Sequence, residues 1–396
     1  MARARPPVGL QHVPGHAADR IARLAGIEGL ARAVMVGTVP LVALEQLGSK
    51  QAVSYAFFGG SIVTVATTLN VARLERLIPR RWILTGGGLA LVGAATLFAL
   101  GPSWSIAIAI GLRSSHASVF SVVLSLYLMD FVAKSDFVNA ESRRFLYLAA
   151  AWLAGPAFGT WLWSNVDPNA PFVTAMAVTV LMLAYHWRLR FDGNEILRAP
   201  IAPAPRIIDS VARFFRRRSL RIAYAITIIR SVFWAALFIY GPIYVVEAGH
   251  PEWMAGALLS ASSATLFLAP VVDRAARRIG VRATMGIGFA LMTVSLSGLA
   301  IIGDAATPGI ALWLLGATGG GMLDVLGNIP FVRLVKPRER AAMASVFSTW
   351  REVSFLIAPA LAALALALGR FWLLYAALAL LSAGGIILTT YLPRRL

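Results

Sequence analysis

The feature that most limits the possible folds of this chain is a series of apolar stretches that recurs along its whole length. Each stretch is about 20 residues long, enough to cross the ~30 Å hydrocarbon layer of a bilayer as a helix. Hydrophobic residues make up 58% of the chain and charged residues only 14%, which is outside the range of soluble domains. No strand-like alternation of polar and apolar residues competes with this pattern. The sequence therefore predicts an all-α polytopic membrane protein.

The hydropathy pattern predicts twelve transmembrane helices, six in each half of the chain. The predicted spans lie near residues 26–47, 52–72, 82–101, 104–131, 145–165, 170–187, 222–246, 253–272, 283–302, 308–332, 341–368 and 371–392. The segment "AADRIARLAGIEGLARAV" also allows the first span to begin at Ala17. Residues 17–187 then form one six-helix bundle and residues 222–392 a second, with tails at residues 1–16 and 393–396.

The net charge of +18 is distributed very unevenly between the two faces of the predicted membrane domain. Of the 36 Lys and Arg, 30 lie on one face: in the N-terminal tail, in the connections on that face such as "RLERLIPRR", "RRRSLR", "DRAARRIGVR" and "VKPRER", and in the C-terminal "PRRL". Only Lys50 and Arg370 lie on the opposite face. This positive-inside pattern places both termini in the cytoplasm, and we expect a multi-pass protein of a bacterial-type inner membrane. The basicity reflects orientation among membrane lipids and does not indicate a nucleic-acid partner.

Several classes of site are absent from the sequence. The first 16 residues are polar and lack the apolar core of a signal peptide. Cysteine is absent, so there are no disulfides or thiolate sites. No His/Asp/Glu cluster has the spacing of metal ligands, and no Walker motif is present. We expect neither a metal, nor a cofactor, nor an enzymatic activity.

The two predicted bundles are separated by the longest polar stretch, residues 188–221. Its "APIAPAP" segment cannot continue a helix. The segment that follows places five apolar residues on one helical stripe with arginines around it, typical of a helix on an anionic cytoplasmic leaflet. These residues are Ile207, Ile208, Val211, Phe214 and Phe215. A basic loop that only fixes the topology is the alternative.

The two halves of the chain match one another in sequence. Arg32-Ala33-Val34 in span 1 matches Arg230-Ser231-Val232 in span 7, and "PLVALE" (Pro40 to Glu45) matches "PIYVVE" (Pro242 to Glu247). Each half has an even number of spans, so the two halves insert in the same orientation. Parallel repeats of six spans are typical of transporters that rock two bundles about a central site.

Over nearly its whole length the chain resembles the major facilitator superfamily. That family carries a G-x-x-x-D-R-x-G-R-type motif after span 2 and a weaker copy after span 8. Here "APVVDRAARRIG" contains Asp273 and Arg274, and "VARLERLIPRR" retains Glu75 and Arg76 without the glycines. The resemblance implies that these loops form the charge contacts that hold the inward gate closed.

The segment "LAGPAFG" in span 5 contains Gly155 and Pro156. It resembles the G-P-x-x-G element of proton-coupled exporters in the family. Because glycine and proline are common in membrane helices, a kink or a close packing contact is the alternative.

Ionisable side chains inside a membrane need a partner, water or a function. Arg32, Arg113 and Arg230 fall inside spans 1, 4 and 7, and neither Arg113 nor Arg230 has an acid within one helical turn. Glu28 lies one turn before Arg32 and could neutralise it, or could extend from the cytoplasmic end of its span toward the surface. A guanidinium stays protonated and binds carboxylate or phosphate through a planar fork of donors. Unless another helix supplies an acid, we expect an anion site in a central cavity; a structural role is the alternative.

The resemblance sharpens this hypothesis. The organophosphate–phosphate antiporter branch of the superfamily binds its substrate between arginines of spans 1 and 7, and Arg32 and Arg230 occupy matching places in the repeat. Trp234, one turn beyond Arg230, is a candidate for an aromatic wall of the same site, with a packing or lipid-facing role as the alternative.

Asp324, Arg351 and Glu352 are the charged residues of spans 10 and 11. A carboxylate that moves between dry and wet surroundings can bind and release a proton, so Asp324 and Glu352 are candidates for proton coupling. A fixed ion pair between Asp324 and Arg351 is the alternative. His116 lies one turn from Arg113, and histidine titrates near neutrality in its ordinary state, but a lone histidine is more often a hydrogen-bonded packing residue.

These observations predict a monomeric secondary active transporter that moves a small organic anion by alternating access, coupled to protons. A proton-driven multidrug exporter and a non-transporting membrane scaffold with the same fold remain alternatives.

Overall fold

The computed structural model describes most of the predicted membrane domain. The described residues are 16–74, 77–132, 137–189, 207–327, 329–335, 343 and 346–393. Within them, twelve helical stretches are long and apolar enough to cross a membrane, which confirms the predicted number.

The first six spans are built from seven α-helices, because α1 and α2 together form one span from Ala18 to Leu47. These helices are α1 (His16–Val36), α2 (Thr38–Leu47), α3 (Lys50–Leu74), α4 (Arg80–Leu100), α5 (Ile106–Phe131), α6 (Phe137–Asn165) and α7 (Ala170–Arg188).

The last six spans follow a short connecting helix, α8. The helices of this half are α8 (Ile207–Arg216), α9 (Arg218–Glu247), α10 (Trp253–Ala264), α11 (Ala269–Ile279), α12 (Val281–Ile302), α13 (Thr307–Leu326), α14 (Ile329–Leu334), α16 (Trp350–Ala367) and α17 (Trp372–Thr390). A single-turn 3₁₀ segment, Thr265–Leu268, joins α10 to α11 within one span.

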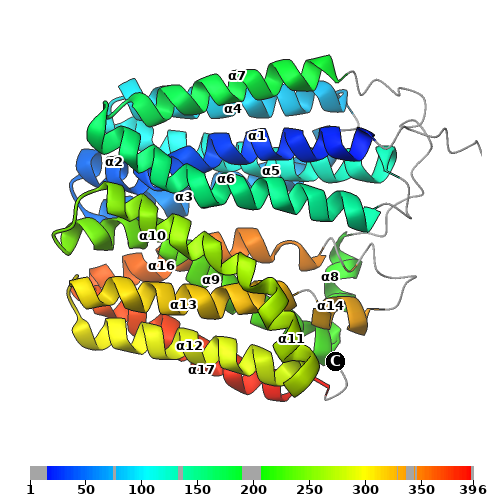
Figure 1. The fold of residues 1–396 in the computed structure, drawn as a ribbon, viewed down its shortest axis with the longest axis vertical. Coiled ribbons are helices and arrows are strands. Elements are labelled where there is room, and N and C mark those ends of the chain that lie inside the picture. Colours follow the sequence, from blue (N-terminus) through cyan, green and yellow to red (C-terminus); the bar gives the residue numbers. More distant parts are fainter. Residues whose placement is uncertain are drawn as a thin grey trace, which may run out of the picture.

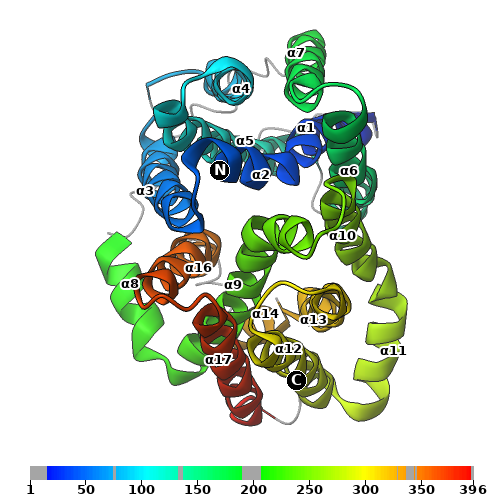
Figure 2. The same cartoon turned by 90° about the vertical axis from the view of Figure 1, so that its left-hand side faces the viewer.

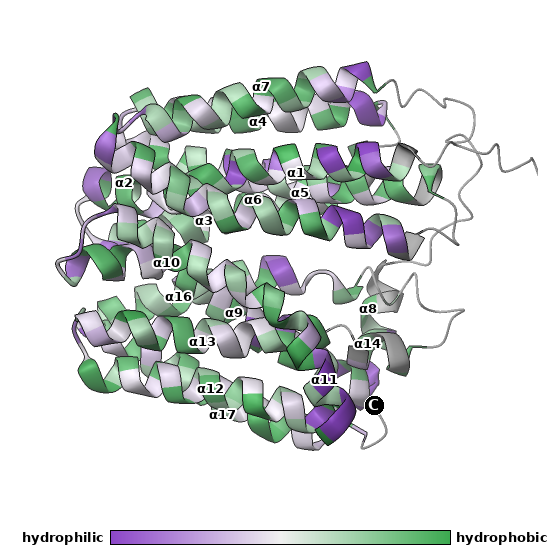
Figure 3. Ribbon diagram, in the orientation of Figure 1, coloured by the Kyte–Doolittle hydropathy of each residue, from purple (hydrophilic) through white to green (hydrophobic). Residues whose placement is uncertain are grey.

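The two halves form two bundles that lie side by side (Figures 1 and 2). The beginning of α1 and the end of α17 lie on the same side of the molecule, on the right in Figure 1, which we call the terminal side. The opposite side, where α2 and α9 end, is called the far side. Hydrophobic residues cover the long faces of the helices, and hydrophilic residues gather at helix ends, as Figure 3 shows.

The first span begins at Ala18, which agrees with the earlier of its two possible starts, so that Glu28 lies inside the membrane helix and is only 1% exposed. The expectation that Glu28 could extend to the surface is therefore wrong. Span 10 ends at Leu326, before the short helix α14, and α16 begins only at Trp350. The prediction from hydropathy joined α13 and α14 into one span because both helices are apolar.

The connecting helix α8 forms where the stripe of apolar residues predicted a helix. Phe214 is completely buried and packs edge-to-face on Tyr224 of α9, with ring centroids 5.7 Å apart. Val211 and Phe215 remain exposed. Phe215 also meets Tyr224 edge-to-face, with centroids 5.6 Å apart, so two aromatic side chains hold the helix to the second bundle while part of its apolar stripe stays exposed.

The bundles are joined on the far side by polar contacts. Lys50 of α3 forms an ion pair with Glu247 of α9, with Nζ 2.9 Å from Oε1, and the ammonium group lies 4.5 Å from the centre of the Phe371 ring. One turn deeper, the hydroxyl groups of Ser54 and Tyr240 are 2.8 Å apart. Gly48 ends α2 in the left-handed conformation, at φ 72°, directly before the turn into α3.

Lys50→Glu is expected to increase the population of molecules open on the far side about five-fold. Reversal of one charge replaces an attraction worth up to ~1 kcal/mol with repulsion from Glu247. The chain has no cysteine, so a single Thr64→Cys substitution can report exposure by its rate of alkylation with an impermeant reagent added on the far side. The exchange Lys50→Glu/Glu247→Lys should return the rate toward the original value. Equal rates in all three proteins would contradict a locking role for this pair.

Candidate functional site

A cavity of about 560 Å³ lies between the two bundles. Its wall comes from α1, α2, α3, α5 and α6 of the first half and from α9 and α16 of the second. Ser61 of α3 donates a hydrogen bond of 2.8 Å to the carbonyl oxygen of Phe355 of α16, which joins the two walls. From this level the lining continues toward the terminal side, to Ala25 on α1 and Arg144 on α6. The cavity is thus closed by contacts on the far side and extends toward the terminal side.

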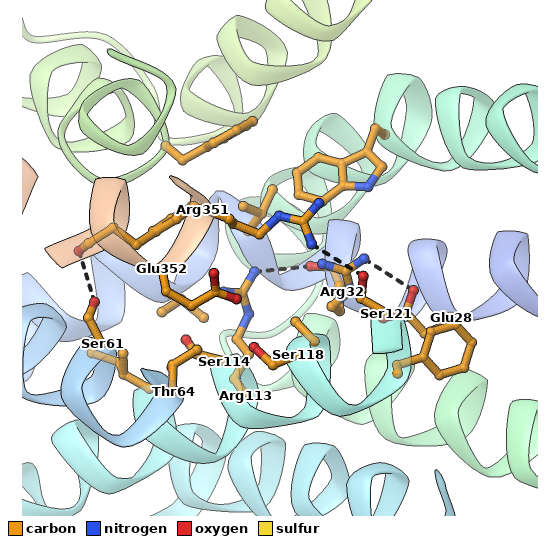
Figure 4. Close-up of a pocket in the computed structure, with 18 of the residues that line it drawn as sticks. Glu28, Arg32, Ser61, Thr64, Arg113, Ser114, Ser118, Ser121, Arg351 and Glu352 are labelled. Carbon is orange, nitrogen blue, oxygen red and sulfur yellow. Dashed lines mark hydrogen bonds and ion pairs between the residues drawn. The ribbon is translucent and has the colours of Figure 1, made fainter. Parts of the chain in front are cut away.

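The charges that line the cavity are unbalanced. Four arginines line it, against two glutamates. These residues are Arg32, Arg113, Arg144, Arg351, Glu28 and Glu352. Figure 4 labels three of the arginines and both glutamates. Arg144 is neutralised by Glu141 on its own helix, 2.7 Å away. The wall therefore carries a surplus of positive charge, which favours an anionic ligand.

Arg32 and Glu28 form an ion pair along α1, as their spacing predicted. In addition, Nη2 of Arg32 lies 3.2 Å from Oε2 of Glu28. The Arg32 guanidinium also lies 5.8 Å from the centre of the Trp152 ring on α6. That close approach of α1 and α6 depends on Gly155, where a Cβ atom would lie 3.1 Å from the Ala33 carbonyl carbon. The small residue in α6 therefore fixes where Arg32 meets the cavity.

Arg113 of α5 enters the cavity without a carboxylate partner among the described residues. Its Nη2 donates a long hydrogen bond of 3.4 Å to the backbone carbonyl oxygen of Arg32, and its Nε is buried without a hydrogen bond. A guanidinium with unsatisfied donors in a cavity wall is suited to bind carboxylate or phosphate. Of the predicted arginines, Arg113 best fits the role of an anion-binding group.

The wall formed by α16 contributes a second pair of charges. Arg351 reaches across to the first bundle, where its Nη1 donates a 3.3 Å hydrogen bond to the hydroxyl of Ser121 on α5. Glu352 points toward the cavity in Figure 4 and forms no ion pair with another described residue. Neither side chain contacts Asp324. The expected pairing of Asp324 with Arg351 is therefore wrong.

A row of hydroxyl groups on α5 completes the polar wall. Its residues follow each other at helical spacing and all line the cavity: Ser114, Ser118, Ser121 and Ser125. Sequence reasoning missed this row. The signal was present in "RSSHASVFSVVLS", because serines three and four residues apart share one helical face. Such hydroxyls can donate to an anion or bind the hydroxyl groups of a ligand.

Arg230, the repeat partner of Arg32, is not in the cavity wall. It is 5% exposed and forms an ion pair with Asp324 of α13, with Nε 3.0 Å from Oδ1. Its guanidinium lies 5.2 Å from the centre of the Trp350 ring, and the absence of a side chain at Gly327 leaves room for it. Arg230 has no acid within one turn of its own helix, and Asp324 on another helix is its partner.

Trp234 lies behind the wall with Arg230. Its ring stacks on that of Phe238, with centroids 5.7 Å apart, and Phe238 is the residue that lines the cavity. Gly320 of α13 faces the other side of the indole, where a Cβ atom would lie 3.2 Å away. In this state Trp234 supports an aromatic wall and does not itself form it.

Of the predicted gate residues, Asp273 and Arg274 lie among the described residues, and Glu75 and Arg76 do not. Asp273 forms an ion pair with Arg277, one turn further along α11, and Arg274 is exposed. Neither of the two pairs with a described residue of the first bundle, which agrees with a cavity that extends toward the terminal side.

The segment around Pro156 forms a contact between the bundles. The backbone amide of Ala157 donates a 3.1 Å hydrogen bond to the hydroxyl of Ser260 on α10, and Thr160 donates one of the same length to the carbonyl oxygen of Trp253. Gly155 and Pro156 thus lie where α6 packs closely on α1 and α10. Among the alternatives for "GPAFG", close packing is the one that the structure shows.

Comparison with known proteins gives the family. Residues 24–275 match the model of the Major Facilitator Superfamily, and no protein with a curated function matches the sequence. Among solved structures, the nucleoside transporter NupG is similar with a TM-score of 0.73 and 12% identity, over 94% of this chain and 97% of that chain. A POT family transporter in complex with a thioalcohol-conjugated peptide has a TM-score of 0.70 and 14% identity, over 93% and 94%. A bacterial homologue of the iron transporter ferroportin, in an inward-facing state, has a TM-score of 0.68 and 17% identity, over 96% and 98%.

At these identities the structures compare the fold alone. The family model, however, covers more than half of the sequence, and its match agrees with the twelve spans and with the two side-by-side bundles. The chain belongs to the major facilitator superfamily of membrane transporters.

Proposed function

We propose that this protein is a secondary active transporter that moves a small organic anion through the cavity between its bundles. The observation that carries the proposal is Arg113, whose guanidinium lines the cavity and has no carboxylate partner among the described residues. Arg351 adds a second cation from the other bundle, so an anion bound between them contacts both halves. A ligand held by both bundles is suited to alternating access, in which the bundles rock about a fixed site.

We further propose that the terminal side faces the cytoplasm of a bacterial-type inner membrane. The support is the distribution of charge, since the loops on that side carry nearly all of the Lys and Arg. The cavity then opens inward. Transport is proposed to be coupled to protons, because ionisable carboxylates face a cavity that is exposed to only one side of the membrane at a time.

A thermal-shift screen of the purified protein tests this function. The probes are succinate, citrate, gluconate and inorganic phosphate, with tetraphenylphosphonium as a lipophilic cation. A ligand that binds only the folded state stabilises it by RT ln(1 + [L]/Kd), about 2.7 kcal/mol at 100 times Kd. At least one of the four anions is expected to raise the melting temperature, and the cation is expected not to. Stabilisation by the cation alone would favour a multidrug exporter, and stabilisation by no probe would contradict the proposal.

A further inference from the structure

His116 of α5 lies between two hydrogen-bond acceptors. Its Nδ1 is 2.9 Å from the backbone carbonyl oxygen of Gly87 on α4, and its Nε2 is 3.2 Å from Oε1 of Glu28 on α1. The imidazole ring is completely buried, and the Glu28 side chain is 2% exposed. Three helices thus meet at this ring.

The hydrogen bonds require one proton more than a neutral ring and a carboxylate can supply together. A carbonyl oxygen only accepts, so Nδ1 carries a proton. The contact between Nε2 and Oε1 needs a second proton, which belongs either to an imidazolium or to a protonated carboxyl group. Without it, two lone pairs would face each other in a buried place, at the cost of an unsatisfied polar contact. The observed geometry is therefore that of a pair that holds a proton.

The surroundings of the pair connect it to the cavity. On α1, Arg32 binds the same carboxylate, and on α5, Arg113 donates to the Arg32 backbone. Across the cavity α16 presents Arg351 and Glu352, and α6 presents Arg144, which Glu141 neutralises.

The remaining neighbours of the pair carry no ionisable group that faces it among the described residues. From α4 the contact is the Gly87 carbonyl oxygen. His186 of α7 lies closer to the terminal side than His116. The centroid of its ring is 6.0 Å from that of Tyr127. Glu28 lines the cavity whereas His116 does not, so a proton can reach the ring from the cavity only through the carboxylate.

We propose that Glu28 and His116 together hold the proton that drives transport, and that this proton enters and leaves with the anion, so that the protein is a symporter. The inference rests on the proposed function and assigns its coupling site. It replaces Asp324, which is occupied by Arg230, and leaves Glu352 as a charge of the opposite wall.

The sign of the coupling follows from electrostatics. With the proton bound, the cluster of Arg32, Glu28, His116 and Arg113 carries one more positive charge than without it, next to the place where the anion binds. The proton therefore favours anion binding and, by linkage, the anion favours proton binding. Loss of the proton to the water of the open cavity weakens the hold on the anion, so both leave on the same side.

Proteoliposomes of the full chain, loaded with a pH-sensitive dye, test the proposal. Succinate, citrate, gluconate and inorganic phosphate, each radiolabelled, are tested one at a time. Exchange of labelled for unlabelled anion at equal pH measures binding and movement without a proton gradient. Accumulation under a pH gradient that is acid outside, together with entry of protons reported by the dye, measures coupling.

The critical variant is His116→Asn, whose amide can still donate to the Gly87 carbonyl oxygen but cannot take up a proton. The variant has the charge of the proton-free pair, so we expect it to bind the anion more weakly and to exchange it at a rate that no longer depends on pH. Accumulation and proton entry should fall by at least about 20-fold. His116→Gln is a second form of the same test if the asparagine variant does not fold. His186→Asn is the matched control, a buried histidine of the same bundle that should accumulate the anion normally.

Each other outcome has a definite meaning. Normal accumulation by both His116 variants, or protons that move against the anion, would overturn the inference while the transport function stands. No exchange of any of the four anions by the unmodified protein would overturn the proposed function and the inference with it.

Discussion

Arg113→Gln is expected to weaken binding of the transported anion about 100-fold without loss of the fold. A hydrogen bond to a charged group contributes about 1.5–3 kcal/mol, and 2.7 kcal/mol corresponds to a 100-fold change in affinity. Because Arg113 neutralises no carboxylate among the described residues, its removal leaves no acid without a partner. Glutamine retains an amide that can donate to the backbone of Arg32. The loss should therefore appear in affinity and not in stability.

Arg113→Lys separates charge from geometry. An ammonium group keeps the positive charge but lacks the planar fork that binds two oxygens at once, so an intermediate loss of about ten-fold is expected. Arg143→Gln is the matched control, because Arg143 is exposed on α6 and does not line the cavity. Affinities are measured by calorimetric titration with whichever of the four anions stabilises the unmodified protein. Unchanged affinity in Arg113→Gln would remove Arg113 from the site.

The number and order of the spans could be predicted because hydropathy is a local property of the sequence. The ion pair of Glu28 and Arg32 could be predicted for the same reason, since the two residues are one helical turn apart. The burial of Glu28 depends on where the first span begins, and hydropathy left that start open between Ala17 and residue 26. The charged residues near the start of α1 lower the average hydropathy there, although the helix continues into the membrane from Ala18.

Contacts between helices were beyond the reach of sequence spacing. Arg230 and Asp324 are 94 residues apart, and the chain offers other acids inside the spans, such as Glu28 and Glu352, as equally plausible partners. The link between His116 and Glu28 has the same character, because it joins α5 to α1 across the bundle. The choice among partners is made by helix packing, which includes the space that Gly327 leaves for the Arg230 side chain.

The internal repeat was informative about position but not about role. Arg32 and Arg230 match in sequence, and both lie in the first helix of their bundle. In the first bundle the fourth span adds a further cation, Arg113, whereas in the second bundle the fourth span supplies the acid Asp324. The first bundle therefore keeps a surplus of positive charge at the cavity, whereas in the second bundle Asp324 neutralises Arg230. The proposed anion site is asymmetric for this reason.

The asymmetry leads to the second large effect: Arg230→Gln is expected to lower the stability of the protein by about 3–5 kcal/mol, the usual cost of removing one partner from a buried ion pair. Asp324→Asn should be similarly harmful, because it leaves the guanidinium without its acid. The double variant Arg230→Gln/Asp324→Asn places two neutral amides side by side, and we expect it to recover most of the loss. Melting temperatures of the purified proteins, arranged as a double-mutant cycle, measure the interaction between the two sites.

The same cycle decides between two roles for Arg230. If the guanidinium bound the anion directly, as the match with Arg32 suggested, Arg230→Gln would reduce affinity for the anion and Asp324→Asn would not restore it. If instead the Arg230 guanidinium only neutralises Asp324 behind the cavity wall, the opposite is expected. The double variant should then regain both stability and anion affinity, because Arg113 and Arg351 are unchanged. A double variant that is stable but does not bind the anion would show that Arg230 belongs to the anion site. The ion pair with Asp324 would then be a contact that breaks when the ligand binds.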